Sequence, residues 1–400
     1  MTRLAFTGDL LVYRSLIKKC KHSNGYDFSV VFEKTKKLLK NSDYTIGNLE
    51  TPLAGKQAGY TRMDMLFNAP TEFARYAKTA GFDMMTTANN HCMDKGKDGI
   101  KSTILTLNNC GLEHTGTFTS ADEKHYLVKE FDGQKIAFIS YTYGINPNVT
   151  GYSLSDEDTY VVNLTKQADK PYKRPWYKEA IVNLIYDLPK SIQDRVHPLY
   201  PNHTYLDNVG EDEINNPRNE PYITNMLNTV KAARKESDFV VFCLHAGGQF
   251  NSTVGEYTKY LVNILKEGGA DVIICNHPHC VLGSEWHDGK FVAYSLGNFT
   301  FTPEEGYFIE GVYGEYGIVL YLDVQSGKLV NVSFSIVKNI KIPNGKEQVI
   351  PVYDLFNVAK TDKEWSILAS DVSAVISRFF NKTICDVDVK DVYFYNEFID

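Results

Sequence analysis

The sequence predicts an α/β protein with one large core, and three observations support this fold class. Between residues 4 and 116, short apolar runs alternate with helix-length amphipathic stretches, which is the pattern of strand and helix units. Several of the short apolar runs end at polar residues, as strands do where a sheet binds a ligand at its carboxyl edge. A chain of 400 residues with 43% hydrophobic composition can bury one sizeable core, so we expect a single domain with additions.

In the first part of the chain, strands and helices are expected to alternate. Strands are predicted at residues 4–7, 44–47 and 84–87, and helices at 28–39, 73–79 and 99–108. The polar residues that follow the three strands include Asp9, Glu50 and Asn90. Because the carboxyl ends of parallel strands meet at one edge of a sheet, we expect these side chains to lie close together.

A predicted hairpin is followed by a long irregular region. Residues 126–131 and 135–141 flank Asp132-Gly133, a strong hairpin turn. From residue 145 to 221 the regular pattern stops, and one helix is predicted at 176–186. Loops of this length are uncommon unless they are functional, so we interpret the insertion as a lid or substrate-selecting element rather than a disordered spacer. Its aromatic residues either line a pocket or pack the insertion onto the domain.

The alternation of strands and helices resumes after the insertion. Helices are predicted at 222–235, 258–266 and 365–379, strands at 239–244, 272–275 and 291–296, and a hairpin at 317–324 with 329–337. His245 follows the first of these strands, and His277-Pro278-His279 follows the second. We predict that residues 1–340 form the main domain, including the 145–221 insertion, and that residues 341–400 form an extension packed on it.

Charge and cysteine content narrow the function classes. The formal net charge of -7 gives no overall positive field, so nucleic acid is not an expected partner. The start of the chain shows no signal core, and no apolar run is long enough to span a membrane, so a cytoplasmic protein is expected unless a leader precedes this sequence. The seven cysteines form no C-x-x-C pair, which disfavours a thiolate zinc site and a disulfide framework.

The residues at the strand ends are of the types that bind metal ions. The candidate metal ligands are Asp9, Glu50, Asn90, His245, His277 and His279. Oxygen and imidazole donors of this kind suit Mn, Fe, Zn or Mg, and we expect two divalent ions. Two neighbouring cations repel each other, so a shared carboxylate is needed to hold them together, and Glu50 is the candidate bridge.

Two short motifs assign further roles. His91 is the candidate general acid, and Asp94, three residues later, is placed to orient its imidazole. The His277-Pro278-His279 segment is expected to be extended, which would place both imidazoles on the same side of the chain.

Five motifs carry a resemblance to a known family. They are Gly8-Asp9, Asn48-Leu49-Glu50-Thr51-Pro52, Ala88-Asn89-Asn90-His91 with Asp94 and Gly96, residues 269–274 leading to His277-Pro278-His279, and Tyr294-Ser295-Leu296-Gly297-Asn298-Phe299. In this order, over residues 8 to 299, they resemble the motifs of CapA-type poly-γ-glutamate capsule biosynthesis proteins, which belong to the calcineurin-like metallophosphoesterase superfamily.

The resemblance implies a four-layer α/β/β/α sandwich of two mixed sheets, and it implies roles for individual residues. It places the first metal on Asp9, Glu50 and His279, and the second on Glu50, Asn90, His245 and His277, with His91 as the acid. The residues expected to contact substrate or support the ligands are Asn48, Asn89, Asn298 and Gln249. The chain departs from the superfamily at Leu11, where an imidazole generally follows the first aspartate, and at Ala246 and Gln249, where the family often has Trp and Glu.

These residues together predict a metal-dependent hydrolase. Two ions would activate a water molecule that attacks a phosphoester, while His91 protonates the leaving oxygen. A γ-glutamyl amide is the second substrate class, and the substrate is expected to be an anionic small molecule or polymer. The alternative is a non-catalytic metal-binding component of capsular polymer synthesis or assembly, which Leu11 favours. The acidic balance disfavours a nuclease, and the sequence leaves the native metal and the oligomeric state open.

Overall fold

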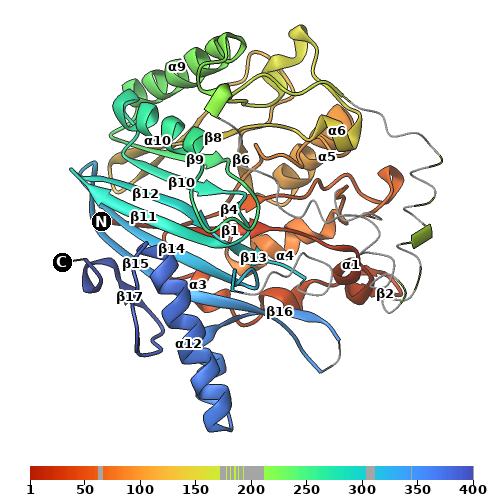
Figure 1. Ribbon diagram of the computed structural model, residues 1–400. Coiled ribbons are helices and arrows are strands. Elements are labelled where there is room, and N and C mark those ends of the chain that lie inside the picture. Colours follow the sequence, from red (N-terminus) through yellow and green to blue (C-terminus); the bar gives the residue numbers. More distant parts are fainter. Residues whose placement is uncertain are drawn as a thin grey trace.

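The computed structural model describes residues 1–61, 66–171, 211–302, 311–343 and 345–399, with isolated positions at 177, 181, 184, 185, 188 and 192. Two large β-sheets lie face to face, and helices cover their outer sides (Figure 1). This arrangement confirms the predicted α/β/β/α sandwich of calcineurin-like proteins.

The first sheet joins the two ends of the chain. Its path is β16 (Glu347–Pro351), β15 (Lys328–Lys341), β14 (Tyr316–Gln325), β1 (Thr2–Leu10), β4 (Tyr44–Leu49), β5 (Met84–Thr86) and β6 (Glu113–Thr115). Strands β1, β4, β5 and β6 are parallel, whereas β14, β15 and β16 pair antiparallel. Off this path, β13 (Asn298–Thr300) pairs with β1, and β17 (Tyr393–Phe394) pairs with β15. The sheet is therefore mixed, as predicted.

The second sheet is also mixed. Its order is β11 (Val281–His287), β12 (Lys290–Leu296), β10 (Val272–Asn276), β9 (Phe239–His245), β8 (Gln134–Thr142) and β7 (Leu127–Phe131). The four central strands are parallel, and the two edge strands pair antiparallel with their neighbours. The predicted hairpin is confirmed as β7 and β8, with positive φ angles at Asp132 and Gly133 in the turn. A short separate hairpin pairs β2 (Lys21–His22) with β3 (Gly25–Tyr26).

The helices are distributed over both faces of the sandwich. They are α1 (Arg14–Cys20), α2 (Ser29–Phe32), α3 (Lys36–Leu39), α4 (Glu72–Ala80), α5 (Gly96–Asn109), α6 (Pro147–Thr150), α9 (Glu220–Glu236), α10 (Glu256–Gly268), α11 (Val352–Val358) and α12 (Asp362–Phe379). The single helix predicted at residues 28–39 is wrong, because α2 and α3 are separate. Both the amide and the hydroxyl of Thr35 donate to Phe32 O, and this local turn interrupts the helical hydrogen bonding.

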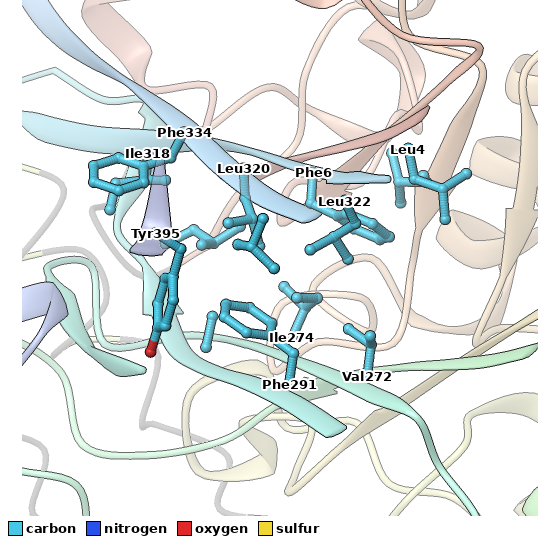
Figure 2. Packing of buried hydrophobic residues seen from close by; sticks show 14 of the residues in the cluster. Leu4, Phe6, Val272, Ile274, Phe291, Ile318, Leu320, Leu322, Phe334 and Tyr395 are labelled. Atoms are coloured by element: carbon cyan, nitrogen blue, oxygen red, sulfur yellow. The ribbon is translucent and has the colours of Figure 1, made fainter. Parts of the chain in front are cut away.

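The core between the sheets follows from strand alternation. Figure 2 shows Leu4 and Phe6 of β1 beside Leu320 and Leu322 of β14, facing Ile274 of β10. Ala5, between the first two, belongs to the cluster on the opposite face of β1. The sequence pattern therefore buries both faces of β1, one between the sheets and the other beneath helices.

Each sheet buries its outer face against helices. On the first sheet, Phe28, Phe32 and Phe73 pack with Met85 and Tyr321. On the second sheet, residues of α9 and α10 pack against the outer side chains of β8, β9 and β10. Burial of this much apolar surface supplies most of the driving force that fixes the strands and their carboxyl ends.

The chain passes from one sheet to the other at Gly297. Strand β12 ends at Leu296, and β13 begins at Asn298 beside β1. The backbones approach so closely here that a Cβ on Gly8 of β1 would lie 2.0 Å from Gly297 O and 3.2 Å from Leu296 O, at the end of β12. The two sheets are thus joined by direct backbone contact at the edge where β1 ends.

The described part of the insertion packs onto α5. An apolar cluster joins this part of the insertion to α5 and to the residues just before it. The insertion contributes Ile145, Val161, Val162 and Leu164. Most of the helix predicted at 176–186, and the aromatic residues Tyr172, Trp176, Tyr200 and Tyr205, lie outside the described residues. The lid role of residues 145–221 stays a prediction.

The C-terminal residues pack on both sheets. β16 extends the first sheet, and α12 lies against β11, where the Ser284 hydroxyl donates to Phe379 O at 2.7 Å (Figure 1). Strand β15 ends at Lys341, close to the predicted boundary after residue 340. The division into a main domain and an extension stays a prediction. No helix in the described parts of the chain combines the length and apolar character that crossing a bilayer requires.

We expect Thr361→Ala to lower the free energy of unfolding by ~1 kcal/mol, because Thr361 caps the start of α12. Its hydroxyl accepts a hydrogen bond from Glu364 N at 3.2 Å, and Glu364 Oε2 accepts one from Thr361 N at 3.2 Å. Urea unfolding followed by circular dichroism measures the change. Thr361→Ser keeps the hydroxyl and should match the parent chain, whereas a fully stable Thr361→Ala protein would contradict this role.

Candidate metal centre

The six predicted ligands converge where strands of both sheets end. Asp9 lies in β1, Glu50 follows β4, Asn90 follows β5, His245 ends β9, and His277 and His279 follow β10. Each residue is at most 4% exposed. Because the strands are parallel and adjacent within each sheet, their carboxyl ends bring together residues that are far apart in the sequence.

Glu50 lies between two groups of potential ligand atoms. One group contains Glu50, His277 and His279, and the other contains Asp9, Glu50 and His245; within each group the donor atoms lie within 4.8 Å of one another. The two groups divide the histidines differently from the assignment that the family resemblance implies. Glu50 belongs to both groups, which is the position required of a shared ligand.

An amide and two imidazoles meet close to Glu50. His245 Nε2 lies 2.8 Å from Asn90 Oδ1, 3.1 Å from His277 Nδ1 and 3.3 Å from Glu50 Oε1. Burial, together with the neighbouring histidines, holds the pKa of His277 well below its ordinary value. A neutral imidazole is the form that binds a metal ion.

A second carboxylate, Asp9, meets His279, which also lies near Glu50. His279 Nδ1 lies 3.3 Å from Asp9 Oδ2, and His279 Nε2 lies 3.8 Å from Glu50 Oε1. Burial opposes a charge on His279, but the carboxylates of Glu50 and Asp9 outweigh it and raise the pKa of His279 to about 9. Burial would likewise raise the pKa of Asp9, but the pairing with His279 outweighs it and lowers that pKa. This concentration of negative charge in a buried place attracts a cation.

The segment that carries His277 and His279 is a turn, so the expectation that it is extended is wrong. His277 has a φ of 106° and His279 a φ of 55°, values that residues with side chains rarely adopt. Two hydrogen bonds hold the turn: His277 N donates to Asp9 Oδ2 at 3.2 Å, and Phe250 N donates to Pro278 O at 2.7 Å. Backbone strain of this kind persists only where surrounding contacts stabilise it, and it is frequent at functional sites.

His91 and Asp94 form the predicted pair. His91 Nδ1 lies 2.8 Å from Asp94 Oδ2, and both side chains are buried. Burial alone would lower the pKa of His91, but the charge and hydrogen bond of Asp94 raise it above its ordinary value. Asp94 Oδ2 also accepts a hydrogen bond from Phe67 N, and the Phe67 ring meets His91 edge to face at 4.6 Å. No sequence motif pointed to Phe67.

Three of the four predicted supporting residues make firm hydrogen bonds. Asn48 Nδ2 donates to Asp9 Oδ1 at 2.7 Å and lies 3.2 Å from His245 Nδ1. Asn298 Oδ1 lies 3.0 Å from His279 Nδ1, while its Nδ2 donates to two backbone carbonyls.

Asn89 and Gln249 complete the set. Asn89 Nδ2 donates to Leu49 O at 2.8 Å, and its Oδ1 accepts from His91 N at 3.1 Å. Gln249 Nε2 lies 3.5 Å from His279 Nε2, at the limit of a hydrogen bond. Asn48 and Asn298 thus contact candidate ligands, Asn89 contacts the backbone of His91, the candidate acid, and Gln249 lies beside His279.

Apolar and aromatic residues that were not predicted as site residues adjoin the candidate ligands. Leu11 is buried in a cluster that also contains Phe67 and Phe250. The ring centroids of Phe250 and His279 lie 5.5 Å apart, and those of Tyr143 and His277 lie 4.9 Å apart. Tyr143 directly follows β8, so the end-of-strand rule that found the ligands would have found it too.

The residues present fit a metal ion. Both carboxylate oxygens of Glu50, Asn90 Nδ2 and His277 Nε2 are buried without a hydrogen-bond partner among the described residues. Burying a polar group without a partner is costly, and an unpaired carboxylate is especially so. A cation bound between the two donor groups would compensate the Glu50 charge, and the oxygen and imidazole donors suit several divalent ions.

Two mixed sheets between helices, with carboxylate, amide and imidazole groups gathered at the strand ends, define a protein of the calcineurin-like phosphoesterase fold. The family model "Bacterial capsule synthesis protein PGA_cap" matches residues 3–303, well over half of the chain. The chain therefore belongs to this family of bacterial capsule synthesis proteins.

Curated relatives bear related names. The capsule biosynthesis protein CapA of Bacillus anthracis is 23% identical over 302 residues, covering 74% of this chain and 59% of its own length. The PGA biosynthesis protein CapA of Bacillus subtilis (strain 168) is 23% identical over 301 residues, covering 74% and 62%. Among solved structures, a hypothetical protein from Thermus thermophilus aligns over 84% of this chain and 99% of its own, with 13% identity and a TM-score of 0.41. The chain spans about three fifths of the length of the two CapA relatives.

Proposed function

We propose that this protein is a metal-dependent hydrolase of the capsule synthesis family. One observation carries the proposal. The buried carboxylate of Glu50 accepts no hydrogen bond from the described residues, and it belongs to both groups of potential ligand atoms. The described residues give neither oxygen a hydrogen bond and bring the His245 and His279 imidazoles near it, whereas a pair of bound cations would compensate its charge directly.

Two divalent ions, when bound, would supply Lewis acidity and would lower the pKa of a water molecule that attacks the substrate. The chain would hold them with Asp9, Glu50 and His279 on one side, and with Glu50, Asn90, His245 and His277 on the other. The grouping of nearby donor atoms puts His245 with Asp9, whereas the family resemblance puts it with Asn90. The distance of 2.8 Å between His245 Nε2 and Asn90 Oδ1 favours the second assignment, with both residues on one ion.

His91 is the proposed proton donor. Its Nδ1 is occupied by Asp94, which fixes the ring and leaves Nε2 to protonate the leaving oxygen. Asp94 also raises the pKa of His91, so the protonated form that an acid needs is favoured.

Phosphoesters are the first substrates to test, and a γ-glutamyl amide is the second class. Names of the curated relatives refer to capsule and PGA biosynthesis, which supports an anionic polymer or its precursor as the substrate of this chain. The field of a site with bound cations would attract such an anion, although the whole chain carries a net charge of -7.

The test is metal analysis of protein purified without chelator, with hydrolysis of an aryl phosphodiester and an aryl phosphomonoester measured across added Mn, Zn, Fe and Mg. We expect about two ions per chain, as in two-metal sites, and turnover that depends on the metal. A folded protein that binds no ion and hydrolyses neither ester would overturn the proposal.

A non-catalytic metal-binding component of polymer synthesis or assembly is the second candidate function. The observation that favours it is Leu11, which is buried in an apolar cluster where related enzymes generally present an imidazole. One ion or fewer per chain, without turnover but with binding of the anionic polymer, would support this function over hydrolysis.

We expect Asp94→Asn to lower kcat by ~10- to 100-fold, the usual effect of losing a carboxylate that orients a catalytic or metal-binding imidazole. The amide can still accept a hydrogen bond, but it no longer favours the protonated form of His91. Steady-state kinetics and metal analysis measure the outcome, and metal content should not change. Asp98→Asn, at an exposed carboxylate in α5, is the matched control. An unchanged kcat in Asp94→Asn would remove Asp94 from the mechanism.

A further inference from the structure

The guanidinium of Arg378, near the end of α12, reaches two loops that carry site residues. Its Nε donates to Val281 O at 2.9 Å, and its Nη2 donates to Asn251 O at 3.3 Å and to Cys280 Sγ at 3.3 Å. Cys280 Sγ in turn donates to Asn251 O at 3.3 Å. One side chain therefore joins the loop after β10 to the loop after β9.

The loop residues that Arg378 contacts lie close in sequence to residues of the candidate metal centre. Cys280 directly follows His279, and Asn251 lies two residues after Gln249, which lies beside His279. Between Gln249 and Asn251, Phe250 contacts the His279 ring and donates to the backbone of Pro278. A displacement of either loop would thus be transmitted to the His279 imidazole.

The turn needs external support because its backbone is strained at both histidines. Arg378 is itself held firmly, since its neighbours Val375, Ile376 and Phe379 are buried in the core between the sheets. The Ser284 hydroxyl bonded to Phe379 O adds a second attachment of α12 to β11. Helix α12 therefore offers a fixed point from which Arg378 reaches the turn.

We propose that Arg378 is a positioning residue for the metal centre, which it serves by fixing the turn from His277 to Cys280 and thereby the orientation of His279. The residue lies beyond the family-matched residues 3–303, so the C-terminal extension takes part in building the site. The metal-binding consequence rests on the proposed function, whereas the restraint on the two loops does not.

An arginine suits this role better than a lysine. The planar guanidinium presents several N–H groups in fixed directions and can serve acceptors on two loops at once. A lysine ammonium keeps the charge but is a single point on a flexible stem, so it would serve the two loops poorly. Arg378→Lys therefore separates the geometry of the contact from its charge.

The test compares Arg378→Met, Arg378→Lys and Ser284→Ala with the parent chain by amide hydrogen exchange read by mass spectrometry. Ser284→Ala is the matched control, because it removes another hydrogen bond between β11 and α12 without removing one to either loop. We expect Arg378→Met to speed exchange by about tenfold in peptides covering residues 247–254 and 277–283, as the loss of charge-assisted hydrogen bonds implies. Ser284→Ala should leave both peptides at parent rates.

Parent exchange rates in both peptides of Arg378→Met would overturn the proposal. Faster exchange of Arg378→Met throughout the chain would mean that this variant is destabilised as a whole. The Arg378→Lys variant then gives the answer: faster exchange in the two loops alone supports the proposal, and parent rates in both loops overturn it.

Calorimetric titration with Mn²⁺ gives the second readout. We expect the affinity of Arg378→Met to fall by about tenfold, the size typical of lost outer contacts to metal ligands, while Ser284→Ala binds like the parent. Arg378→Lys should weaken binding as well, which a purely electrostatic effect would not produce. A parent chain that binds no Mn²⁺ would count against the proposed hydrolase, and the exchange data would still decide the role of Arg378.

Discussion

Replacing Glu50 by Gln is expected to abolish binding of the two ions and to lower turnover by more than ~100-fold, since even residues that only support a ligand change affinity by up to that factor. The amide keeps the size of the side chain but removes the negative charge that two neighbouring cations would share. In the parent chain, neither oxygen of Glu50 accepts a hydrogen bond from the described residues.

The expected loss is measured by metal analysis and by thermal unfolding with and without Mn²⁺. A ligand at 100 times its Kd stabilises the folded state by ~2.7 kcal/mol, and this stabilisation should vanish in Glu50→Gln. Glu315→Gln is the matched control, because Glu315 also buries a carboxylate oxygen without a hydrogen-bond partner among the described residues but lies outside the site. Two ions retained by Glu50→Gln would show that Glu50 is not the shared ligand.

Replacing His91 by Ala is expected to lower kcat by ~10²- to 10⁴-fold, the usual contribution of a general acid. Metal content should remain, because the contacts of His91 are to Asp94, to Asn89 through its amide and to Phe67, and not to the grouped ligand atoms. Steady-state kinetics with an alkyl phosphodiester, whose alkoxide leaving group needs protonation, measures the full effect.

A substrate with a good leaving group sharpens this experiment. If His91 protonates the leaving oxygen, a nitrophenolate leaving group, which needs little protonation, should suffer a smaller loss than an alkoxide. His114→Ala, at a histidine in β6, is the control and should keep full activity. Equal losses with both leaving groups would argue against an acid role for His91.

Much of the candidate site could be predicted because it depends on strand order. Asp9, Glu50 and His245 each lie at or just after the end of a short apolar run, and such runs form parallel strands whose ends share an edge. No contact had to be known in advance. The same reasoning reaches Asn90, which follows β5 of the first sheet, whereas Asn298 was expected from the family resemblance.

What the sequence did not reveal depends on contacts between distant residues. The φ angles of His277 and His279 are set by bonds to Asp9 and to the backbone around Phe250, which no local pattern encodes. One miss has a local cause: at the break between α2 and α3 the Thr35 hydroxyl donates to Phe32 O, and apolar spacing does not register such a side-chain contact.

The crossing at Gly297 has a mechanical consequence for the proposed pair of ions. Sheets in a sandwich can slide or spread slightly in thermal motion, and such motion has its smallest amplitude where the sheets are tied together. The close backbone contact of Gly8 with Gly297, and the hydrogen bond from Asp9 N to Gly297 O at 3.0 Å, tie them at the edge where Asp9 of one sheet accepts a hydrogen bond from His277 N, just after a strand of the other. We therefore expect the distance between ligands from different sheets to vary less than the spacing of the sheets elsewhere, and a residue larger than glycine at position 8 would disturb this contact.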